Sequence, residues 1–404
     1  MYASATGQSM AYCSRKNRQS QVLTYSRHID YNRGTMASKA YKYRYYSTTA
    51  SAWDGMYQAI LSAKKSIYWE VYIFSDDLSG ARFIEALCDR ARSGLEVKLI
   101  LDAVGSMGFS STAQSKLHLA GAEVLWYNSL LPGWHLKAWL SRLWRRNHRK
   151  LLIIDGEKAF LGGVNIDDRE KSWQDLNVEI HGEVVRPLLR VFARTYWRAG
   201  GKRKNVRKLF NYEPIAILNE WTEKISFIAH SPIYLSHRLF IKRFYRRALK
   251  KARHEVNILT PYYSPNRRFL KLMEKTCRRG VRVNLMLPVK NDITFIGYIN
   301  ESFLASTLST GAKIYLMPGM NHGKALAVDN KFGLVGSFNL TPRSFDLNEE
   351  SGVYFTIPAM VDDLNSILDG WKKGAKLLDN QTQLTKSLWH HFWQWFTSIF
   401  KDYV

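Results

Sequence analysis

Two short clusters of histidine, lysine and aspartate stand at the same internal spacing in this chain of 404 residues. The clusters consist of His148, Lys150 and Asp155 in the first copy and of His322, Lys324 and Asp329 in the second. Corresponding members lie 174 positions apart. One such pattern can arise by chance, but a repeat in register is a much stronger signal. The duplication therefore predicts two related halves that each bring a histidine and a lysine to one chemistry.

Further polar and small residues follow each cluster in the same order. At the same offset stand Gly163 and Asn165 in the first copy and Ser337 and Asn339 in the second. A carboxylate comes later in each copy. Glu179 follows its histidine by 31 residues and Glu350 by 28, within the similar stretches Leu-Asn-Val-Glu and Leu-Asn-Glu-Glu.

This set of residue types suits the transfer of a phosphodiester. The lysines, the asparagines and the backbone N–H groups at Gly163 and Ser337 would stabilise negative charge on the phosphoryl oxygens. One histidine can act as nucleophile while the other protonates the leaving alkoxide and later activates the acceptor. A carboxylate on the far ring nitrogen would fix each tautomer, a role expected for Glu179 and Glu350. The alternative is a pair of repeated buried strands with incidental polar residues.

Both copies resemble the signature of the phospholipase D superfamily, His-x-Lys-x4-Asp followed by Gly-Gly/Ser-x-Asn. In that family two α/β domains build one active site at their interface. The resemblance implies that His148 is the nucleophile and His322 the general acid/base, and that the lysines and asparagines hold the phosphoryl group. It also implies that Asp155 and Asp329 brace the motif. The sequence itself is nearly symmetric on which histidine reacts first.

Stretches outside the motifs narrow the resemblance to bacterial-type cardiolipin synthases in a short form without N-terminal transmembrane helices. These stretches are 70–74, 103–106, 260–265, 316–320 and 343–348, and the similarity covers about 48–380. It implies transfer of a phosphatidyl group to phosphatidylglycerol through a phospho-histidine, with no cofactor and no metal. Two alternatives remain open. One is a phospholipase D-type phosphodiesterase or nuclease that hydrolyses phospholipid or nucleic acid, and the other is a non-catalytic membrane-binding protein with the same fold.

Hydrophobic periodicity predicts alternating strands and helices in both halves. Strands are expected at 67–74, 97–102, 256–260 and 283–288, and helices at 81–92 and 269–279, each helix ended by a glycine. This alternation favours an α/β fold of two tandem domains with mixed sheets. The expected organisation is a basic tail at 1–47, domains at 48–205 and 206–380, and an aromatic amphipathic helix at 381–404.

Two aromatic segments have the pattern of helices that lie on a membrane. A 16-residue insertion precedes the first motif, within 130–146, and places Trp139 and Trp144 on one apolar face bordered by basic residues. The end of the chain, with Trp389 and Trp393, repeats this pattern. Such faces bind the interfacial region of a bilayer. The alternative for each segment is a helix packed on the protein itself.

The net charge of +25 predicts a polyanionic partner. Part of this positive charge lies in a basic helix expected at 235–253. The sequence alone does not show whether the charge of this helix meets a partner or is simply solvated. Together with the aromatic segments, the charge favours anionic phospholipid and a membrane surface over nucleic acid. No run of 18 apolar residues is present, and the three cysteines show no pairing pattern. A peripheral protein on the cytoplasmic face of a bacterial inner membrane is therefore expected, with a mitochondrial location as the alternative.

Overall fold

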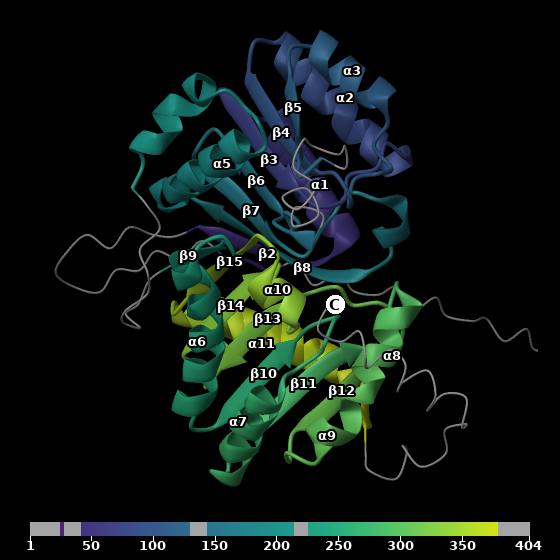
Figure 1. The fold of residues 1–404 in the computed structure, drawn as a ribbon, viewed down its shortest axis with the longest axis vertical. Helices are drawn as coiled ribbons and strands as arrows, with labels where there is room; N and C mark the ends of the chain where they lie inside the picture. Colours follow the sequence, from purple (N-terminus) through teal and green to yellow (C-terminus); the bar gives the residue numbers. More distant parts are fainter. Residues whose placement is uncertain (1–24, 28–41, 130–143, 214–224, 379–404) are drawn as a thin grey trace, which may run out of the picture.

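Two mixed β-sheets of eight strands each form the framework, in a computed structural model that describes residues 25–27, 42–129, 144–213 and 225–378. Figure 1 shows the first half above the second. In spatial order the first sheet contains β1 (Tyr25–Arg27), β2 (Tyr43–Thr48), β8 (Gln174–His181), β7 (Lys158–Gly162), β6 (Leu151–Ile154), β3 (Ser66–Val71), β4 (Glu96–Asp102) and β5 (Glu123–Tyr127). The second contains β16 (Lys376–Leu378), β12 (Lys313–Met317), β11 (Arg282–Pro288), β10 (Glu255–Leu259), β13 (Ala325–Val328), β14 (Phe332–Gly336), β15 (Glu350–Phe355) and β9 (Ile225–His230).

The two sheets have the same topology once the edge strands β1 and β16 are set aside. In each, three neighbouring strands are parallel, β3 with β4 and β5, and β10 with β11 and β12. The strand that follows each histidine motif, β6 or β13, pairs antiparallel with the first of these. Two tandem α/β units with mixed sheets, as the repeat predicts, are confirmed.

Helices cover both sheets, and their ends follow local sequence signals. The first half contains α1 (Thr49–Leu61), α2 (Leu78–Arg92), α3 (Ser111–Leu119) and α5 (Arg186–Arg198). The second contains α6 (Leu235–Lys251), α7 (Arg267–Arg278), α8 (Thr294–Ser302), α9 (Leu304–Leu308), α10 (Pro342–Asp346) and α11 (Pro358–Lys373). Asp77 caps α2 by accepting a hydrogen bond from the backbone of Gly80, and Asn266 caps α7 in the same way. Gly94 and Gly280, each just past a helix, have φ values of 86° and 82°.

One apolar cluster joins the halves. It combines side chains of β2, β7, β8 and α5 with side chains of β13, β14, β15 and α11. Two buried tyrosine hydroxyls of β2 also reach across: Tyr43 donates to Asp363 at 2.8 Å and Tyr45 to the carbonyl of Met360 at 3.1 Å. The two sheets therefore share a core and do not meet only through a polar surface.

The structure moves the limits expected for the first domain. Strand β2 begins within the segment predicted as a tail, since its backbone pairs with β8 from Tyr43 onward. At the other end a 3-10 helix, η3 (Arg203–Asn211), packs on α5 across the expected boundary at 205. Arg190 holds it there by donating to the carbonyls of Phe210 and Tyr212, each at 2.9 Å. The C-terminal segment 381–404 lies outside the described residues. None of the described helices is long and apolar enough to cross a membrane.

Candidate active site between the two halves

The backbone of each histidine motif is hydrogen-bonded to the opposite half. The amide of His148 donates to the carbonyl of Glu349 at 2.9 Å, and the amide of His322 donates to the carbonyl of Gln174 at 2.7 Å. These bonds place the segment before β6 beside the start of β15, and the segment before β13 beside the start of β8. Each histidine is therefore presented to side chains from the other half of the chain.

Each histidine ring is bonded to a carboxylate from the opposite half. Nδ1 of His148 lies 3.0 Å from Glu350, and Nδ1 of His322 lies 3.0 Å from Asp175. All four side chains are buried. With Nδ1–H donating to the carboxylate, the Nε2 lone pair of each ring is left for a reacting group. Glu350 was expected to orient a motif histidine, and it does so. The histidine that it bonds is His148 of the first half, not His322 of its own half.

The expectation that Glu179 orients a histidine of the motifs is wrong. Its carboxylate accepts from the hydroxyl of Tyr46 at 2.6 Å, bonds His181 at 2.6 Å and pairs with Lys158 at 3.4 Å. Asp175, four residues earlier on β8, takes the role. Side chains at 175 and 179 point to the same face of the strand, but only 175 lies at the end that meets the second half.

The strand register shows that Glu350 corresponds to Asp175 and not to Glu179. Gly162 of β7 pairs with Asn177 of β8, and the equivalent Gly336 of β14 pairs with Gly352 of β15. Equivalent positions on β8 and β15 therefore differ by 175 residues. That offset matches Asp175 with Glu350. The similar Leu-Asn pairs at 176–177 and 347–348 are not equivalent, because β15 begins only at Glu350.

The backbones of Gly163 and Ser337 were expected to contact phosphate, but their amides are already engaged. Gly163 donates to the carbonyl of Leu176 at 3.0 Å and Ser337 to that of Ser351 at 2.9 Å. Both residues instead support the carboxylates. A Cβ on Gly163 would lie 2.1 Å from the carboxylate of Asp175, and the hydroxyl of Ser337 donates to Glu350. A glycine makes room in one half where a serine makes a hydrogen bond in the other.

The two lysines lie deep in the same site. Burial and the neighbouring Lys324 lower the pKa of Lys150 to about 7, and burial lowers the pKa of Lys324 to about 8 against the opposing effect of Asp175. Their ammonium groups contact only backbone carbonyls of their own motifs, those of His148 at 3.1 Å and His322 at 2.5 Å, among the described hydrogen bonds. Both cations therefore keep donors available for a phosphoryl group.

Burial and the same two lysines set the pKa of the histidines. The pKa of His148 is lowered well below its ordinary value, first by burial and then by Lys150 and Lys324. Burial and Lys324 also lower the pKa of His322, but Asp175 acts in the opposite direction. Both rings are therefore driven toward the neutral form, which is the form a nucleophile requires, and His322 has the stronger support for a proton.

The asparagines differ between the halves. Asn165 donates to Glu170 at 2.8 Å and accepts from the amide of Ile73 at 3.3 Å. The side-chain oxygen of the equivalent Asn339 is buried and has no partner among the described residues. Among the described hydrogen bonds, the side-chain N–H groups of Asn339 have no acceptor and can donate to a phosphoryl oxygen, whereas Asn165 already donates to Glu170.

Glu170 was not singled out in the sequence, and it is the main departure from symmetry. It lies on a 3-10 helix, η1 (Asp168–Glu170), and its counterpart at the 174-residue offset is Ser344, which donates to Glu350 at 2.7 Å. Burial and the nearby Asp175 raise the pKa of Glu170 to about 8. One of its oxygens is buried without a partner among the described residues. The sequence does contain a signal for this difference: Glu170 stands five residues after Asn165, whereas Ser344 stands five residues after Asn339.

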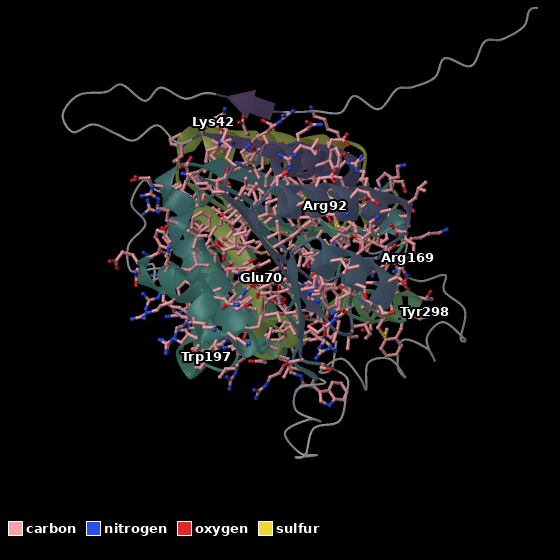
Figure 2. All side chains as sticks on the ribbon, turned by 90° about the horizontal axis from the view of Figure 1, so that it is seen from above. Lys42, Glu70, Arg92, Arg169, Trp197 and Tyr298 are labelled. Atoms are coloured by element: carbon pink, nitrogen blue, oxygen red, sulfur yellow. The ribbon has the colours of Figure 1, made fainter. Side chains whose placement is uncertain are left out.

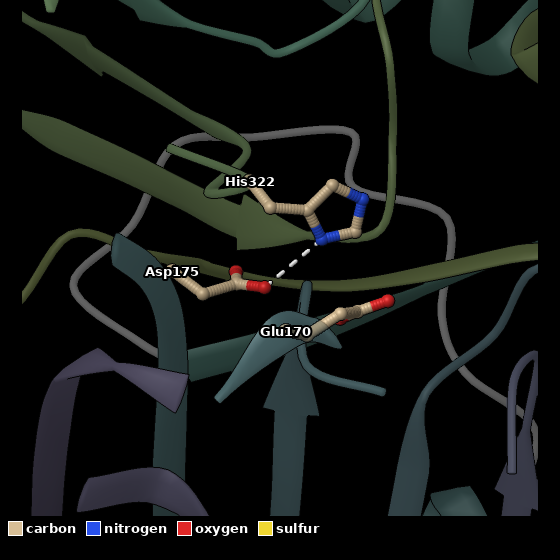
Figure 3. A group of neighbouring side chains, drawn as sticks. All are labelled: Glu170, Asp175 and His322. Carbon is tan, nitrogen blue, oxygen red and sulfur yellow. Dashed lines mark hydrogen bonds and ion pairs between the residues drawn. The ribbon is translucent and has the colours of Figure 1, made fainter. Parts of the chain in front are cut away.

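Glu170, Asp175 and His322 offer ligand atoms that lie within 4.8 Å of one another, a grouping that could hold a metal ion. Figure 3 shows the His322 ring bonded to Asp175 with Glu170 beside them. The positive charges of Lys150 and Lys324 act on the same two carboxylates. These lysines can balance the carboxylate charge in place of a cation, so the expectation of a metal-free site stays a prediction.

A buried arginine, Arg149, holds the backbone of Glu350, whose carboxylate is bonded to His148. Arg149 donates to the backbone carbonyl of Glu350 at 3.2 Å and to the carboxylate of Glu349 at 2.5 Å. It also lies 3.7 Å from the fully buried Glu70, which appears in the interior of the molecule in Figure 2. The equivalent residue in the second motif is Gly323, where a Cβ would lie 2.9 Å from Leu259. Arg149 is thus a positioning residue that the sequence comparison missed.

Asp155 and Asp329 make no contact with the histidines among the described hydrogen bonds. Asp155 accepts from the amides of residues 64–66 at 2.7 to 3.2 Å, and Asp329 accepts from those of 253–255 at 2.7 to 2.9 Å. Both residues have a positive φ, 56° and 54°. They brace the turn after the motif strand, as the resemblance implies, and do not face the reacting groups.

Four tryptophans were expected to contact the membrane. Trp139, Trp389 and Trp393 lie outside the described residues. Trp144 is described, and its side chain is 48% exposed beside the first motif.

Comparison with known proteins shows the family of this chain. The family model described as "Cardiolipin synthase, PLD-like domain" matches residues 56–197 and 245–371. A cardiolipin synthase of Clostridium perfringens is 32% identical over 76% of this chain and 66% of its own length, and a cardiolipin synthase 1 of Staphylococcus epidermidis is 28% identical over 81% and 66%. The chain thus spans about two thirds of the length of these relatives.

Among solved structures, the phosphatidylserine synthase of Haemophilus influenzae aligns with a TM-score of 0.69 over 90% of this chain and 95% of its own. At 15% identity this likeness concerns the fold alone. The family model covers both motifs and most of both sheets. The chain therefore belongs to the cardiolipin synthase family with phospholipase D-like domains.

Proposed function

We propose that this protein is a phosphatidyltransferase that makes cardiolipin by moving a phosphatidyl group to phosphatidylglycerol through a phospho-histidine intermediate. One observation carries the proposal: each motif histidine is bonded at 3.0 Å to a carboxylate of the opposite half, with both lysines beside them. Relatives of the same family are named cardiolipin synthase, which supports this choice of substrate.

The surroundings of the two rings support His148 as nucleophile and His322 as general acid. His148 has the more strongly lowered pKa and is bonded to Glu350, so it is held neutral. Asp175, bonded to His322, raises the pKa of that ring against the lowering by burial and Lys324, so His322 is the ring with the stronger support for a proton. A neutral nucleophile and a protonated acid are the starting states that phosphodiester transfer requires.

The reaction then runs in two balanced steps. Nε2 of His148 attacks the phosphorus of the donor lipid, the bond to the leaving oxygen breaks, and His322 gives that oxygen its proton. In the second step a hydroxyl of phosphatidylglycerol gives its proton to His322 as its oxygen attacks phosphorus. The P–N bond breaks, which releases cardiolipin and restores His148. Lys150, Lys324 and Asn339 stabilise the charge on the phosphoryl oxygens in both steps.

The proposed partner is an anionic phospholipid membrane, which the protein would bind from one side. The net charge of +25 and the exposed Trp144 beside the first motif support this. The cytoplasmic face of a bacterial inner membrane is the proposed location. The donor, phosphatidylglycerol or phosphatidylethanolamine, is left to experiment.

Hydrolysis is the competing activity, because water in place of the lipid hydroxyl would turn the same two steps into a phospholipase D or nuclease reaction. The experiment that separates them incubates the purified protein with vesicles of phosphatidylglycerol, and separately with single-stranded DNA. Lipid products are identified by mass spectrometry. We expect cardiolipin and glycerol; phosphatidic acid alone, or DNA fragments without cardiolipin, would support the hydrolase instead.

Variants of the two histidines test whether the halves form one site. His148→Ala and His322→Ala should each abolish transfer, because each step needs both rings, while the melting temperature stays near that of the wild type. Near-normal transfer by either variant would refute a shared site.

The same assay with a chelator present should proceed, because lysines supply the positive field; activity that returns only with added zinc or magnesium would assign a metal to Glu170, Asp175 and His322.

A further inference from the structure

The second half has a surface groove that the catalytic site does not use. It lies between α6, α7 and α10 and has a volume of about 430 Å³. Apolar side chains form its wall, namely Leu239, Leu272, Phe269 and Phe345. Basic side chains form its rim, namely Lys242, Arg243, Arg246 and Arg268. We call this the α6–α7 groove.

The rim carries positive charge that the described residues do not neutralise. Lys242 is paired with Asp346 at 2.5 Å. Arg243, Arg246 and Arg268 are exposed, and among the described residues none of the three is paired with a carboxylate. Helix α6 has seven basic residues and no acidic one. Exposed arginines beside an apolar wall offer both hydrogen-bond donors and apolar surface to a single ligand, an anion with an apolar part.

The described part of the first half has no equivalent of this groove's chemistry between α1 and α2. Helix α1 occupies the place of α6 in the repeat and contains no lysine or arginine. Between α1 and α2 an aspartate and an arginine neutralise each other, since Arg82 donates to Asp54 at 2.9 Å. The basic rim is therefore a feature of one half and does not follow from the repeated fold.

The groove adjoins the catalytic site through the five-residue helix α10. Pro342, Phe345 and Asp346 of this helix line the groove. Ser344 on the same helix donates to Glu350, the partner of His148, at 2.7 Å. The charge of Arg343 acts on the pKa of His148 itself. A molecule in the groove would thus sit at the edge of the site, separated from it by one short helix.

We propose that the α6–α7 groove binds an anionic phospholipid of the bilayer, at a site separate from the catalytic centre. The arginines of the rim hold the phosphate, and the wall of Leu239 and Phe269 packs against acyl chain. This lipid holds the mouth of the catalytic site against the membrane. The proposal rests on the proposed function only in that the substrate is also a lipid.

The test compares full-length wild-type protein with two charge-matched variants in vesicle flotation. The groove variant is Arg243→Glu/Arg246→Glu/Arg268→Glu, and the control, Lys271→Glu/Lys275→Glu/Lys331→Glu, reverses three exposed lysines that do not line the groove. With vesicles of phosphatidylcholine and phosphatidylglycerol, the groove variant should bind roughly tenfold to hundredfold more weakly and the control much less so. Equal losses in both variants would mean that only net charge matters and would overturn the proposal.

A second readout locates the lipid directly. Phosphatidylglycerol with a photoreactive group on its acyl chain is irradiated in vesicles with wild-type protein, and labelled peptides are mapped. Label on α6 and α7 supports the groove, whereas label confined to other segments overturns it.

Single-stranded RNA is the competing occupant. If the groove variant loses RNA binding while vesicle binding is unchanged, the groove is a nucleic-acid site and the proposal fails.

Turnover separates this proposal from the function itself. The groove variant should transfer between short-chain soluble lipids at the wild-type rate, since it alters no group of the catalytic site. If wild-type protein makes no cardiolipin, the proposed function fails, but flotation and labelling still decide the groove. If transfer proceeds normally and the groove variant binds vesicles like the wild type, the groove proposal fails alone.

Discussion

His148 and His322 make the same bond to a carboxylate but stand in different surroundings. Glu350 is fixed by two serine hydroxyls, those of Ser337 and Ser344. Among the described residues Asp175 accepts from no such pair of hydroxyls, and it lies near Glu170. Two near-identical motifs can therefore differ in how strongly each ring holds a proton, which is the difference that a two-step transfer uses.

At the residue scale, the correction from Glu179 to Asp175 can be tested directly. Asp175→Asn should lower kcat/KM for a short-chain lipid by at least about 100-fold, because an amide no longer favours the required tautomer and charge of His322. Glu179→Gln should leave kcat/KM nearly unchanged, since that side chain bonds Tyr46 and His181 away from the site.

The pH profile of each variant supplies the control for this comparison. Loss of Asp175 removes a group that raises the pKa of His322, so the pH optimum should shift as well as the rate. If Glu179→Gln proves the more damaging change, or Asp175→Asn changes only the melting temperature, Asp175 is merely structural.

The lysines predict the alkaline side of the wild-type pH profile. Their pKa values of about 7 for Lys150 and about 8 for Lys324 lie below that of ordinary lysine, so their charge is lost as pH rises through this range. We expect kcat/KM for a short-chain lipid to fall between about pH 7 and pH 9. A melting curve at each pH checks that the protein stays folded. A rate that is flat up to pH 10 would contradict charged lysines as the source of phosphoryl stabilisation.

At the scale of elements, the strands β6 and β13 are positioned by the aspartates that follow them. Asp155→Ala removes the acceptor of three backbone amides at the start of β3 and places alanine at a positive φ. The free energy of unfolding should fall by about 2–4 kcal/mol, measured by urea denaturation. Activity per folded molecule should change little, because Asp155 does not face the histidines.

Two further variants make this stability prediction specific. Asp155→Asn should cost less, because asparagine tolerates the same backbone conformation. Asp89→Ala removes an exposed aspartate that, among the described residues, is paired only with Arg92 on its own helix, and it should cost at most about 1 kcal/mol. Equal losses for Asp155→Ala and Asp89→Ala would show that the brace contributes little.

At the scale of the whole molecule, the shared core predicts that the two halves unfold together. Apolar side chains of both sheets form one cluster, and Tyr43 of β2 is bonded to Asp363 of α11. Hydrogen exchange should therefore show the central strands β4 and β11 opening with the same free energy. Tyr43→Phe, which removes that one bond, should weaken both strands equally. Protection lost in one sheet while the other stays intact would mean that the halves are separate folding units.

The sequence by itself determined the repeat, the α/β class and most of the central elements. Residues 67–74 and 81–92 were expected as a strand and a helix and correspond to β3 and α2. These predictions succeed because they depend on local periodicity and on helix-ending glycines. The histidines, lysines and Glu350 were found for the same reason, since each stands in a recognisable local pattern.

Only the tertiary structure decided which side chains meet. Asp175, Glu170 and Arg149 act through partners far along the chain, and the bond from His322 to Asp175 joins residues 147 positions apart. Strand register sets these meetings, and a shift of a few residues moves a carboxylate from the site to its edge, as it does for Glu179. The extents of the first sheet and of its helical layer also depend on non-local contacts, namely the pairing of β2 with β8 and the packing of η3 on α5. A sequence fixes local conformation directly, whereas contacts between distant segments depend on how the sheets pair and pack.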